Sequence, residues 1–145
     1  MMQEVNRSAL LPFSASQLYD LVADIERYPQ FLPGCVSARI LRHHPEGGLD
    51  AELSLQQGPA KIRFATRNRM DPDRCIEMRL HEGPLKALEG RWDFHPIGDR
   101  GCRVELYVGF DVGRTAAGLL LSPLLETVCH RMIDAFSRRA ADLHG

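Results

Sequence analysis

Acid–base chemistry is the first possibility that the sequence raises, because carboxylates and imidazoles recur there at alternate positions. Asp93 and His95 flank Phe94, and Glu77 and His81 occur in a second run of the same kind. A carboxylate beside an imidazole can transfer protons to a bound substrate. Alternate residues of a β-strand share one face, however, and Phe94 belongs to the apolar set. We therefore expect these polar side chains to point away from the interior, and we predict no catalytic residue.

The other histidines and the cysteines lack the spacing of a metal or nucleophile site. His43 and His44 precede Pro45 in an expected turn, and His130 follows Cys129. We expect each of these histidines to be solvated or packed, and we predict neither a metal nor a required cofactor. No serine-nucleophile motif or glycine-rich phosphate loop occurs in the sequence. Without a C-x-x-C pair, the cysteines are expected to be reduced and mostly buried: Cys35, Cys75, Cys102 and Cys129.

The run KIRFATRNRM is the strongest local basic feature of the chain. Its cations fall at alternate positions, so one strand would present them on one face: Lys61, Arg63, Arg67 and Arg69. Two interpretations remain open for this face. It either follows the phosphates of an RNA or is solvated and balanced by acids on neighbouring strands, such as Glu77, Glu89 and Asp93.

Two short helices are expected before most of the strands. Ser14 and Gln17 occupy the N-cap and capping-box positions of a helix from about Ala15 to Ala23. A second, very short helix should end within the segment RYPQFLPGC, because its two prolines prevent continuation. This turn fixes three large apolar side chains, which either pack the short helices onto the sheet or form the lip of a cavity: Tyr28, Phe31 and Leu32.

A period of two dominates the sequence from Val36 to Val112, with interruptions rich in Gly, Pro and Asp. This pattern predicts six antiparallel strands after a first strand at about Val5 to Leu10. Thr66 and Asn68 continue the inward parity of Phe64, where they either bind a ligand's polar head or lie past the sheet's edge in water. The other inward positions are apolar and include Val36, Ala38, Ile40, Leu53, Leu55, Ile62, Ile76, Met78, Leu80, Leu88, Trp92, Phe94, Val104, Leu106, Val108 and Phe110.

The last element is a long amphipathic helix from about Ala116 to Leu143, with Leu125 on its apolar stripe. Pro123 either starts a new helix or kinks a continuous one. The element order predicts an α+β fold in which a seven-stranded antiparallel sheet wraps around the terminal helix. The space between sheet and helix is then either filled by side chains or is a ligand cavity.

Length and composition restrict the function classes further. With 145 residues, 44% of them hydrophobic, the chain is expected to form a single domain over residues 1–145. No signal-like start and no run of 18 apolar residues is found, so we expect a cytoplasmic protein with at most peripheral membrane contact. A net charge of -1 gives no overall attraction to nucleic acid. We therefore predict no DNA partner.

Several segments together resemble one family, the START-like (helix-grip) proteins that include coenzyme Q-binding and ribosome association toxin (RatA-type) members. The segments are DIERYPQFLPGC, TRN, IEMRLHEGPLKALEGRWDFHP, GCRVEL and MIDAFSRRA, and the resemblance covers about Val5 to Leu143. It implies a helix-grip fold with a lipophilic cavity. Many quinone-binding members carry a tryptophan after the second proline, where this chain has Gly34, as in the RatA-type branch.

The resemblance implies three functions, in the order in which the sequence favours them. The first is non-enzymatic binding of ubiquinone or another isoprenoid lipid in support of respiration. The second is RatA-type association with the large ribosomal subunit, which blocks subunit joining, and the third is a polyketide cyclase-like enzyme. The expected ligand-binding residues are Tyr28, Phe31, Leu32, Phe64, Thr66, Asn68, Met78, Trp92, Phe94 and Leu125, and the expected RNA-binding residues are Lys61, Arg63, Arg67 and Arg69.

Overall fold

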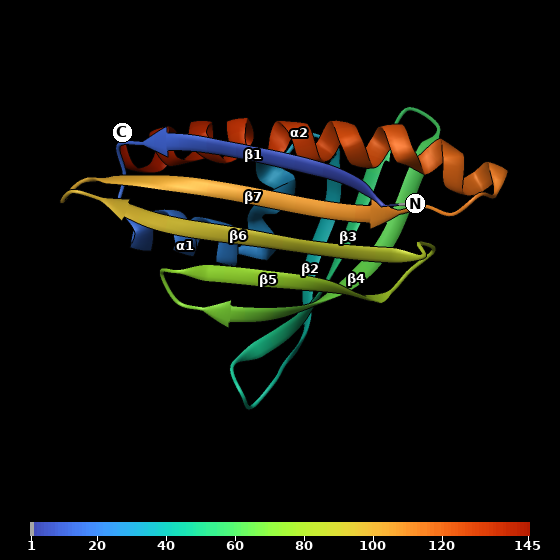
Figure 1. Ribbon diagram of the computed structural model, residues 1–145, viewed down its shortest axis with the longest axis horizontal. Coiled ribbons are helices and arrows are strands. Elements are labelled where there is room, and N and C mark those ends of the chain that lie inside the picture. Colours follow the sequence, from blue (N-terminus) through green and yellow to red (C-terminus); the bar gives the residue numbers. More distant parts are fainter. Residues whose placement is uncertain (1) are drawn as a thin grey trace.

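Seven strands form one antiparallel sheet in the computed structural model, which describes residues 2–145 (Figure 1). The spatial order is β1-β7-β6-β5-β4-β3-β2, so the first strand of the chain pairs with the last. This confirms the predicted sheet. The strands are β1 (Gln3–Leu11), β2 (Cys35–His43), β3 (Gly48–Gln57), β4 (Ala60–Asp71), β5 (Cys75–Glu82), β6 (Ala87–Ile97) and β7 (Gly101–Asp111).

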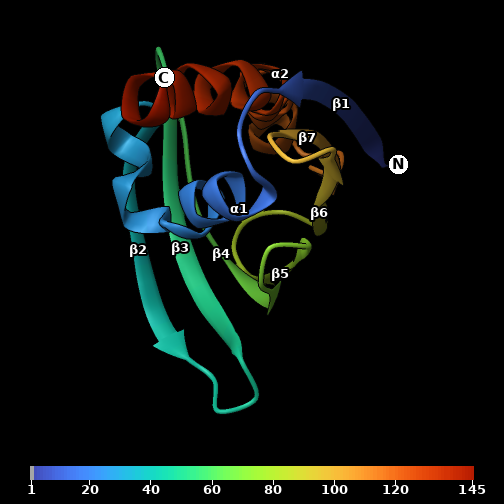
Figure 2. The same cartoon turned by 90° about the vertical axis from the view of Figure 1, so that its left-hand side faces the viewer.

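Two short helices follow β1, as predicted. Helix α1 (Ala15–Ala23) begins with a complete capping box, in which the Ser14 hydroxyl accepts from the Gln17 N–H and the Gln17 side chain accepts from the Ser14 N–H. The six-residue 3₁₀ helix η1 (Ile25–Gln30) ends after Pro29. Figure 2 shows these helices at the open end of the curved sheet, with the β2–β3 hairpin extending beyond the other strands.

The long helix α2 (Ala116–His144) covers the apolar side of the sheet (Figures 1 and 2). It is continuous through Pro123, which settles the alternative that the sequence left open. Pro123 has no N–H to donate to the Leu119 carbonyl. Both residues are exposed, so water can hydrogen-bond that carbonyl instead. Among the described residues, no helix is both long and apolar enough to cross a bilayer. The tightest part of the core contains Trp92, Leu106, Phe110, Leu124 and Leu125.

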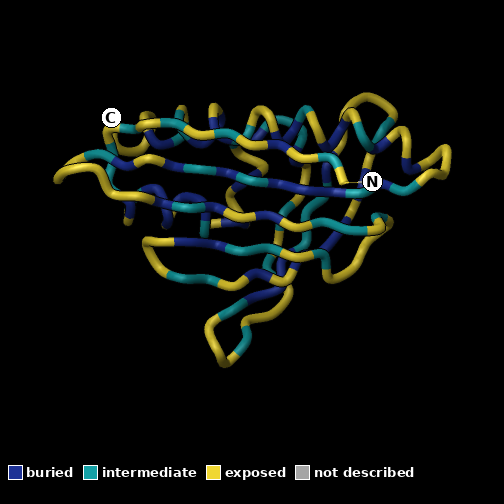
Figure 3. Tube along the Cα trace, viewed as in Figure 1, coloured by how far each residue is buried: buried dark blue, intermediate teal, exposed yellow. Residues whose placement is uncertain are grey.

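Burial follows the predicted parity along most strands, as the dark blue segments of Figure 3 illustrate. The prediction was wrong for Val36, which is 58% exposed. An irregularity in the β2–β3 register between Cys35 and Ser37 places one extra residue in β2, so Cys35 instead takes the inward place opposite Leu55. A strict period of two cannot anticipate such a bulge, because the inserted residue shifts the parity behind it.

Candidate functional site: the two faces of strand β4

The proline-bounded turn packs the short helices against α2. Tyr28 is buried and its hydroxyl donates to the Val22 carbonyl, and burial raises the pKa of this phenol. The Phe136 ring of α2 meets the rings of Tyr28 and Phe31 edge-on, at centroid distances of 5.3 and 5.0 Å. The Arg139 guanidinium lies 5.2 Å from the Phe31 centroid. Tyr28 and Phe31 therefore form one aromatic cluster with the terminal helix.

The space between the sheet and α2 contains a small apolar cavity of about 60 Å³. Ligand sites for small molecules usually occupy about 300–1,000 Å³, so this cavity does not accommodate an aromatic ring in the observed conformation. Five of the expected ligand-binding residues line it: Leu32, Phe64, Thr66, Met78 and Leu125. The interior side of β4 therefore faces a nearly filled space.

Trp92 and Phe94 lie apart from that cavity. They line a second apolar void, of about 10 Å³, together with side chains of α1 and α2. The two rings stack at a centroid distance of 6.3 Å, and Trp92 meets Phe136 edge-on at 5.2 Å. Nine of the ten residues expected to bind a ligand are thus distributed over an aromatic cluster, a small cavity and a separate void, and Asn68 lies at a fourth place.

Thr66 and Asn68 are both buried, which excludes the alternative that they lie past the sheet's edge in water. The Thr66 hydroxyl donates to the Asn68 side-chain oxygen over 2.7 Å. Thr66 lines the apolar cavity, whereas Asn68 lines an open hollow beside the β2–β3 hairpin. Each residue therefore has a partner inside the protein, and the pair marks the polar end of the apolar interior.

The outer face of β4 carries the four predicted cations, and two of them are neutralised. Arg67 binds Asp50 of β3 through two hydrogen bonds, of 2.9 and 3.3 Å. His44 contacts the same carboxylate at 2.9 Å, and His81 lies 3.8 Å from it. Hydrogen bonds from Arg67 and His44 hold the pKa of Asp50 well below its usual range. Arg69 pairs with Glu77 at 2.8 Å, and this bond also lowers the pKa of Glu77.

Asp50 is one of the residues that the sequence analysis missed. It is only 5% exposed although it lies on the outer face, because Arg67, His44 and His81 surround it. The β3–β4 register sets Asp50 directly opposite Arg67. The outward parity of both residues is visible in the sequence, but the pairing depends on a register that a single sequence does not contain.

The residues considered for acid–base chemistry lie on this outer face, as parity predicted. Asp93 is bound by Arg91 at 2.8 Å, and His95 lies 3.4 Å from Glu105. His81 contacts the Asp50 carboxylate at its edge. These carboxylates and imidazoles pair with neighbours across the outer face, where Glu77 and His81 border one open hollow and Asp93 and Glu105 border another.

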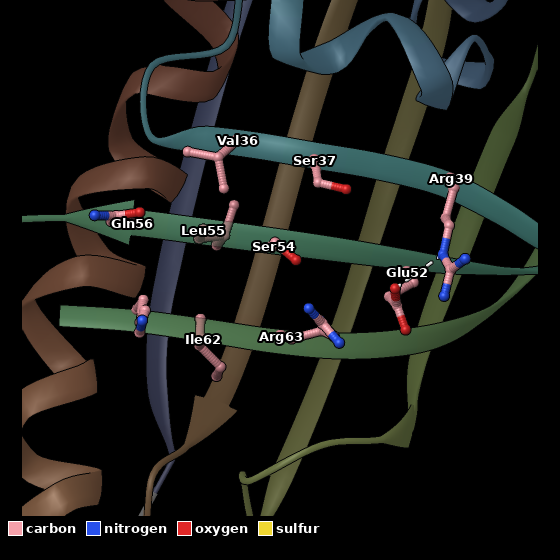
Figure 4. A pocket seen from close by; sticks show the side chains of 10 residues that line it. Val36, Ser37, Arg39, Glu52, Ser54, Leu55, Gln56, Ile62 and Arg63 are labelled. Carbon is pink, nitrogen blue, oxygen red and sulfur yellow. Dashed lines mark hydrogen bonds and ion pairs between the residues drawn. The ribbon is translucent and has the colours of Figure 1, made fainter.

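Lys61 and Arg63 differ from the other two cations of β4, since neither has an ion-pair or hydrogen-bond partner within residues 2–145. Both border an open groove of about 710 Å³ on the outer face of β2, β3 and β4, which we call the outer groove (Figure 4). Its polar lining consists of Ser37, Arg39, Glu52, Ser54, Gln56, Lys61 and Arg63. Arg39 and Glu52 pair at 3.0 Å, which leaves the two β4 cations unneutralised.

The model of one protein family, described as polyketide cyclase/dehydrase and lipid transport, matches residues 11–137. That match covers most of the chain. The chain belongs to this family.

Several relatives that are similar along the whole chain are named for the ribosome. The chain is 40% identical over 145 residues to the ribosome association toxin RatA of Pseudomonas aeruginosa, with all of both chains covered. It is 36% identical over 143 residues to RatA of Escherichia coli K12, covering 99% of this chain and 90% of the relative. The coenzyme Q-binding protein COQ10 homolog B of Xenopus laevis is 29% identical over 146 residues, covering 98% and 59%.

Solved structures share the helix-grip architecture of this chain. The Zhui aromatase/cyclase from Streptomyces sp. R1128 superimposes with a TM-score of 0.83 at 20% identity, covering 97% of this chain and 94% of that one. A START superfamily protein of Mycobacterium smegmatis gives 0.81 at 20% identity, covering 97% and 98%. At this identity the likeness concerns the fold alone, so the cyclase neighbour is no evidence of catalysis here.

Proposed function

We propose that this chain associates with the large ribosomal subunit and blocks subunit joining, without catalysing a reaction. The observation that carries the proposal is its 40% identity to a ribosome association toxin along its entire length. The outer groove supports the same function, because it presents unpartnered cations on an open surface. Lipid binding, which the sequence alone placed first, therefore becomes the second candidate.

Sedimentation tests this proposal directly. The purified chain is mixed with separated ribosomal subunits at low salt and centrifuged through a sucrose gradient. We expect it to travel with the large subunit and, when small subunits are added, to reduce the amount of joined ribosomes. A chain that remains at the top of the gradient at low salt would overturn the proposal.

Quinone binding is retained as a second candidate because of one observation, the apolar cavity with Thr66 in its lining. Met78 and Met132 also line it, and methionine side chains rearrange readily, so a ligand could enlarge the space. Mass spectrometry of lipids that co-purify with the native protein tests this candidate. A quinone in stoichiometric amount would support it, whereas lipid-free protein that binds no short-chain ubiquinone in a calorimetric titration would contradict it.

A further inference from the structure

Three hydrogen-bond donors line up across the outer groove. The register pairs Ser37 of β2 with Ser54 of β3, and Ser54 with Arg63 of β4. Adjacent strands are about 4.8 Å apart, so these side chains form one continuous row on the outer face. Figure 4 shows Ser37, Ser54 and Arg63 on the three neighbouring strands. Neither serine hydroxyl has a hydrogen-bond partner within residues 2–145.

The rows on either side differ in charge. Two residues further along, Gln56 lies opposite Lys61, about 6.7 Å from the first row. In the other direction, the Arg39–Glu52 pair occupies the end of the groove, and this pair is internally neutral. Lys61 and Arg63 therefore leave two positive charges beside three uncharged donors, the hydroxyls of Ser37 and Ser54 and the amide of Gln56.

We propose that the outer groove binds the phosphodiester backbone of RNA, with adjacent phosphates held by Arg63 and Lys61. The inference rests on the proposed ribosome association, and it names the surface and the chemistry of that contact. Phosphate oxygens only accept hydrogen bonds, and the two serine hydroxyls and the Arg63 guanidinium supply donors in one row. The groove contains no aromatic side chain on which a base could stack, so recognition is independent of base sequence.

RNA fits this surface better than two other anionic partners. An anionic membrane would require apolar side chains to insert, and Val36 is the one strongly exposed apolar side chain at the groove. An acidic peptide could bind by extending the sheet at β2, but η1 packs against that strand. Moreover, the Glu26 carboxylate already accepts the Ile40 N–H at 3.2 Å. The free donors lie on the face of the sheet instead of its edge.

Nuclear magnetic resonance of the ¹⁵N-labelled chain tests the site, because it detects even weak binding. On titration with single-stranded oligouridylate, the largest shifts are expected at the amides of Ser37, Ser54, Lys61 and Arg63. Two phosphate contacts predict that log K falls with log salt at a slope of about -1.4. Shifts that map to another surface, or no shifts at millimolar RNA and low salt, would overturn the proposal.

Three double variants separate the contributions. The change K61Q/R63Q should weaken RNA binding at least about tenfold and flatten the salt dependence. S37A/S54A should weaken it by about three- to tenfold while leaving the salt slope unchanged, since only uncharged donors are lost. The matched control R69Q/R103Q removes two cations that already pair with Glu77 and Glu105, and should change affinity by less than about twofold. A control that loses as much affinity as K61Q/R63Q would contradict the site.

Parallel sedimentation distinguishes this inference from the proposed function. If the chain travels with the large subunit and K61Q/R63Q does so equally, the groove is not the contact, although ribosome association stands. If RNA shifts the groove residues but the chain never sediments with ribosomal subunits, the ribosomal function fails and the RNA site stands. A parallel titration with vesicles of anionic lipid tests the membrane as the alternative partner. Groove shifts with vesicles but not with RNA would overturn the proposal.

Discussion

The two faces of strand β4 correspond to the two candidate functions. They differ in how completely their side chains are packed or paired. On the inner face, Phe64 is packed and Thr66 donates to Asn68, which leaves a cavity of about 60 Å³. On the outer face, Lys61 and Arg63 border a groove of about 710 Å³ without partners among the described residues. A polyanion can bind the outer face as it stands, whereas a quinone would have to enlarge the inner one.

The outer face itself shows the same contrast from one end to the other. The register sets Arg67 opposite Asp50 and Arg69 opposite Glu77, and both pairs close into salt bridges. At the other end, the β3 partners of Arg63 and Lys61 are Ser54 and Gln56, which carry no charge. Four cations that look equivalent in the sequence therefore differ in whether they are ion-paired, which depends on the residue opposite each one on the neighbouring strand.

The largest expected effect concerns the inner face. Phe64→Ala should lower the free energy of unfolding by about 3–5 kcal/mol, because a large buried ring is replaced by a cavity. Phe64→Leu should cost less, since most of the volume remains filled. Urea unfolding measures both variants. If Phe64→Ala left stability unchanged, the inner face would be loosely packed, and the contrast between the two faces would disappear.

Charge reversal on the outer face should have the next largest effect. K61E/R63E is expected to lower the affinity for the large subunit, measured by co-sedimentation, about a hundredfold, because two phosphate contacts become repulsive. R100E/R138E makes the same change in net charge at exposed positions in the β6–β7 turn and on α2, and it should bind nearly as the unmodified chain does. Equal losses in the two variants would show that overall charge, and not the outer groove, controls binding.

Asp50 should make the stability of the chain depend on pH. Because the pKa of Asp50 is lowered on folding, its stabilising contribution is complete above the ordinary pKa of about 3.9 and is lost as the pH falls toward the folded value. Asp50→Asn should lower stability at pH 7 by about 1–3 kcal/mol. Below pH 4 the difference from the unmodified chain should shrink.

Urea unfolding at pH 7 and pH 3 measures this dependence on Asp50. Asp99→Asn, at an exposed turn, is the matched control and should change stability little at either pH. A loss in Asp50→Asn that is equally large at both values would mean that packing, and not the carboxylate charge, stabilises the cluster.

The smallest effect is expected at the polar end of the interior. Thr66→Val removes the donor to the Asn68 oxygen and should cost about 1 kcal/mol, whereas Thr66→Ser retains the hydroxyl and should cost less. Neither variant should alter co-sedimentation with ribosomal subunits, since the side chain faces away from the outer groove. Reduced ribosome binding by a stably folded Thr66→Val variant would show that the two faces of β4 do not act independently, which contradicts the contrast drawn between them.

The sequence allowed the fold to be predicted almost completely, because alternation and helix caps are local signals. Helix α1 was predicted with both of its boundaries, and the six strands after Val36 were confirmed. The bulge at Val36 escaped prediction, since an extra residue in a strand has no compositional signature. The buried state of Thr66 and Asn68 also depended on how far the sheet curves over them, which parity does not determine.

The candidate site was less predictable, because it depends on which strands are neighbours and in which register. The cations of β4 were recognised as a group. Which of them are ion-paired and which are not depends on the residues opposite them, Asp50, Glu77, Ser54 and Gln56. Ser37 drew no attention in the sequence, although it completes the row with Ser54 and Arg63. A face of a strand can therefore be read from one sequence, whereas a site that spans three strands cannot.

Directed hydroxyl-radical probing tests most directly whether the outer groove contacts ribosomal RNA. The four native cysteines are buried, and burial raises the pKa of Cys35 to about 11 and of Cys129 to about 12, so an iron-chelate reagent should attach to a single introduced thiol. Gln57→Cys places that thiol at the exposed end of β3 beside the groove, and Ala141→Cys places it at an exposed position on α2. The account predicts scission of large-subunit RNA from position 57 and little from position 141, whereas scission only from position 141 would contradict it.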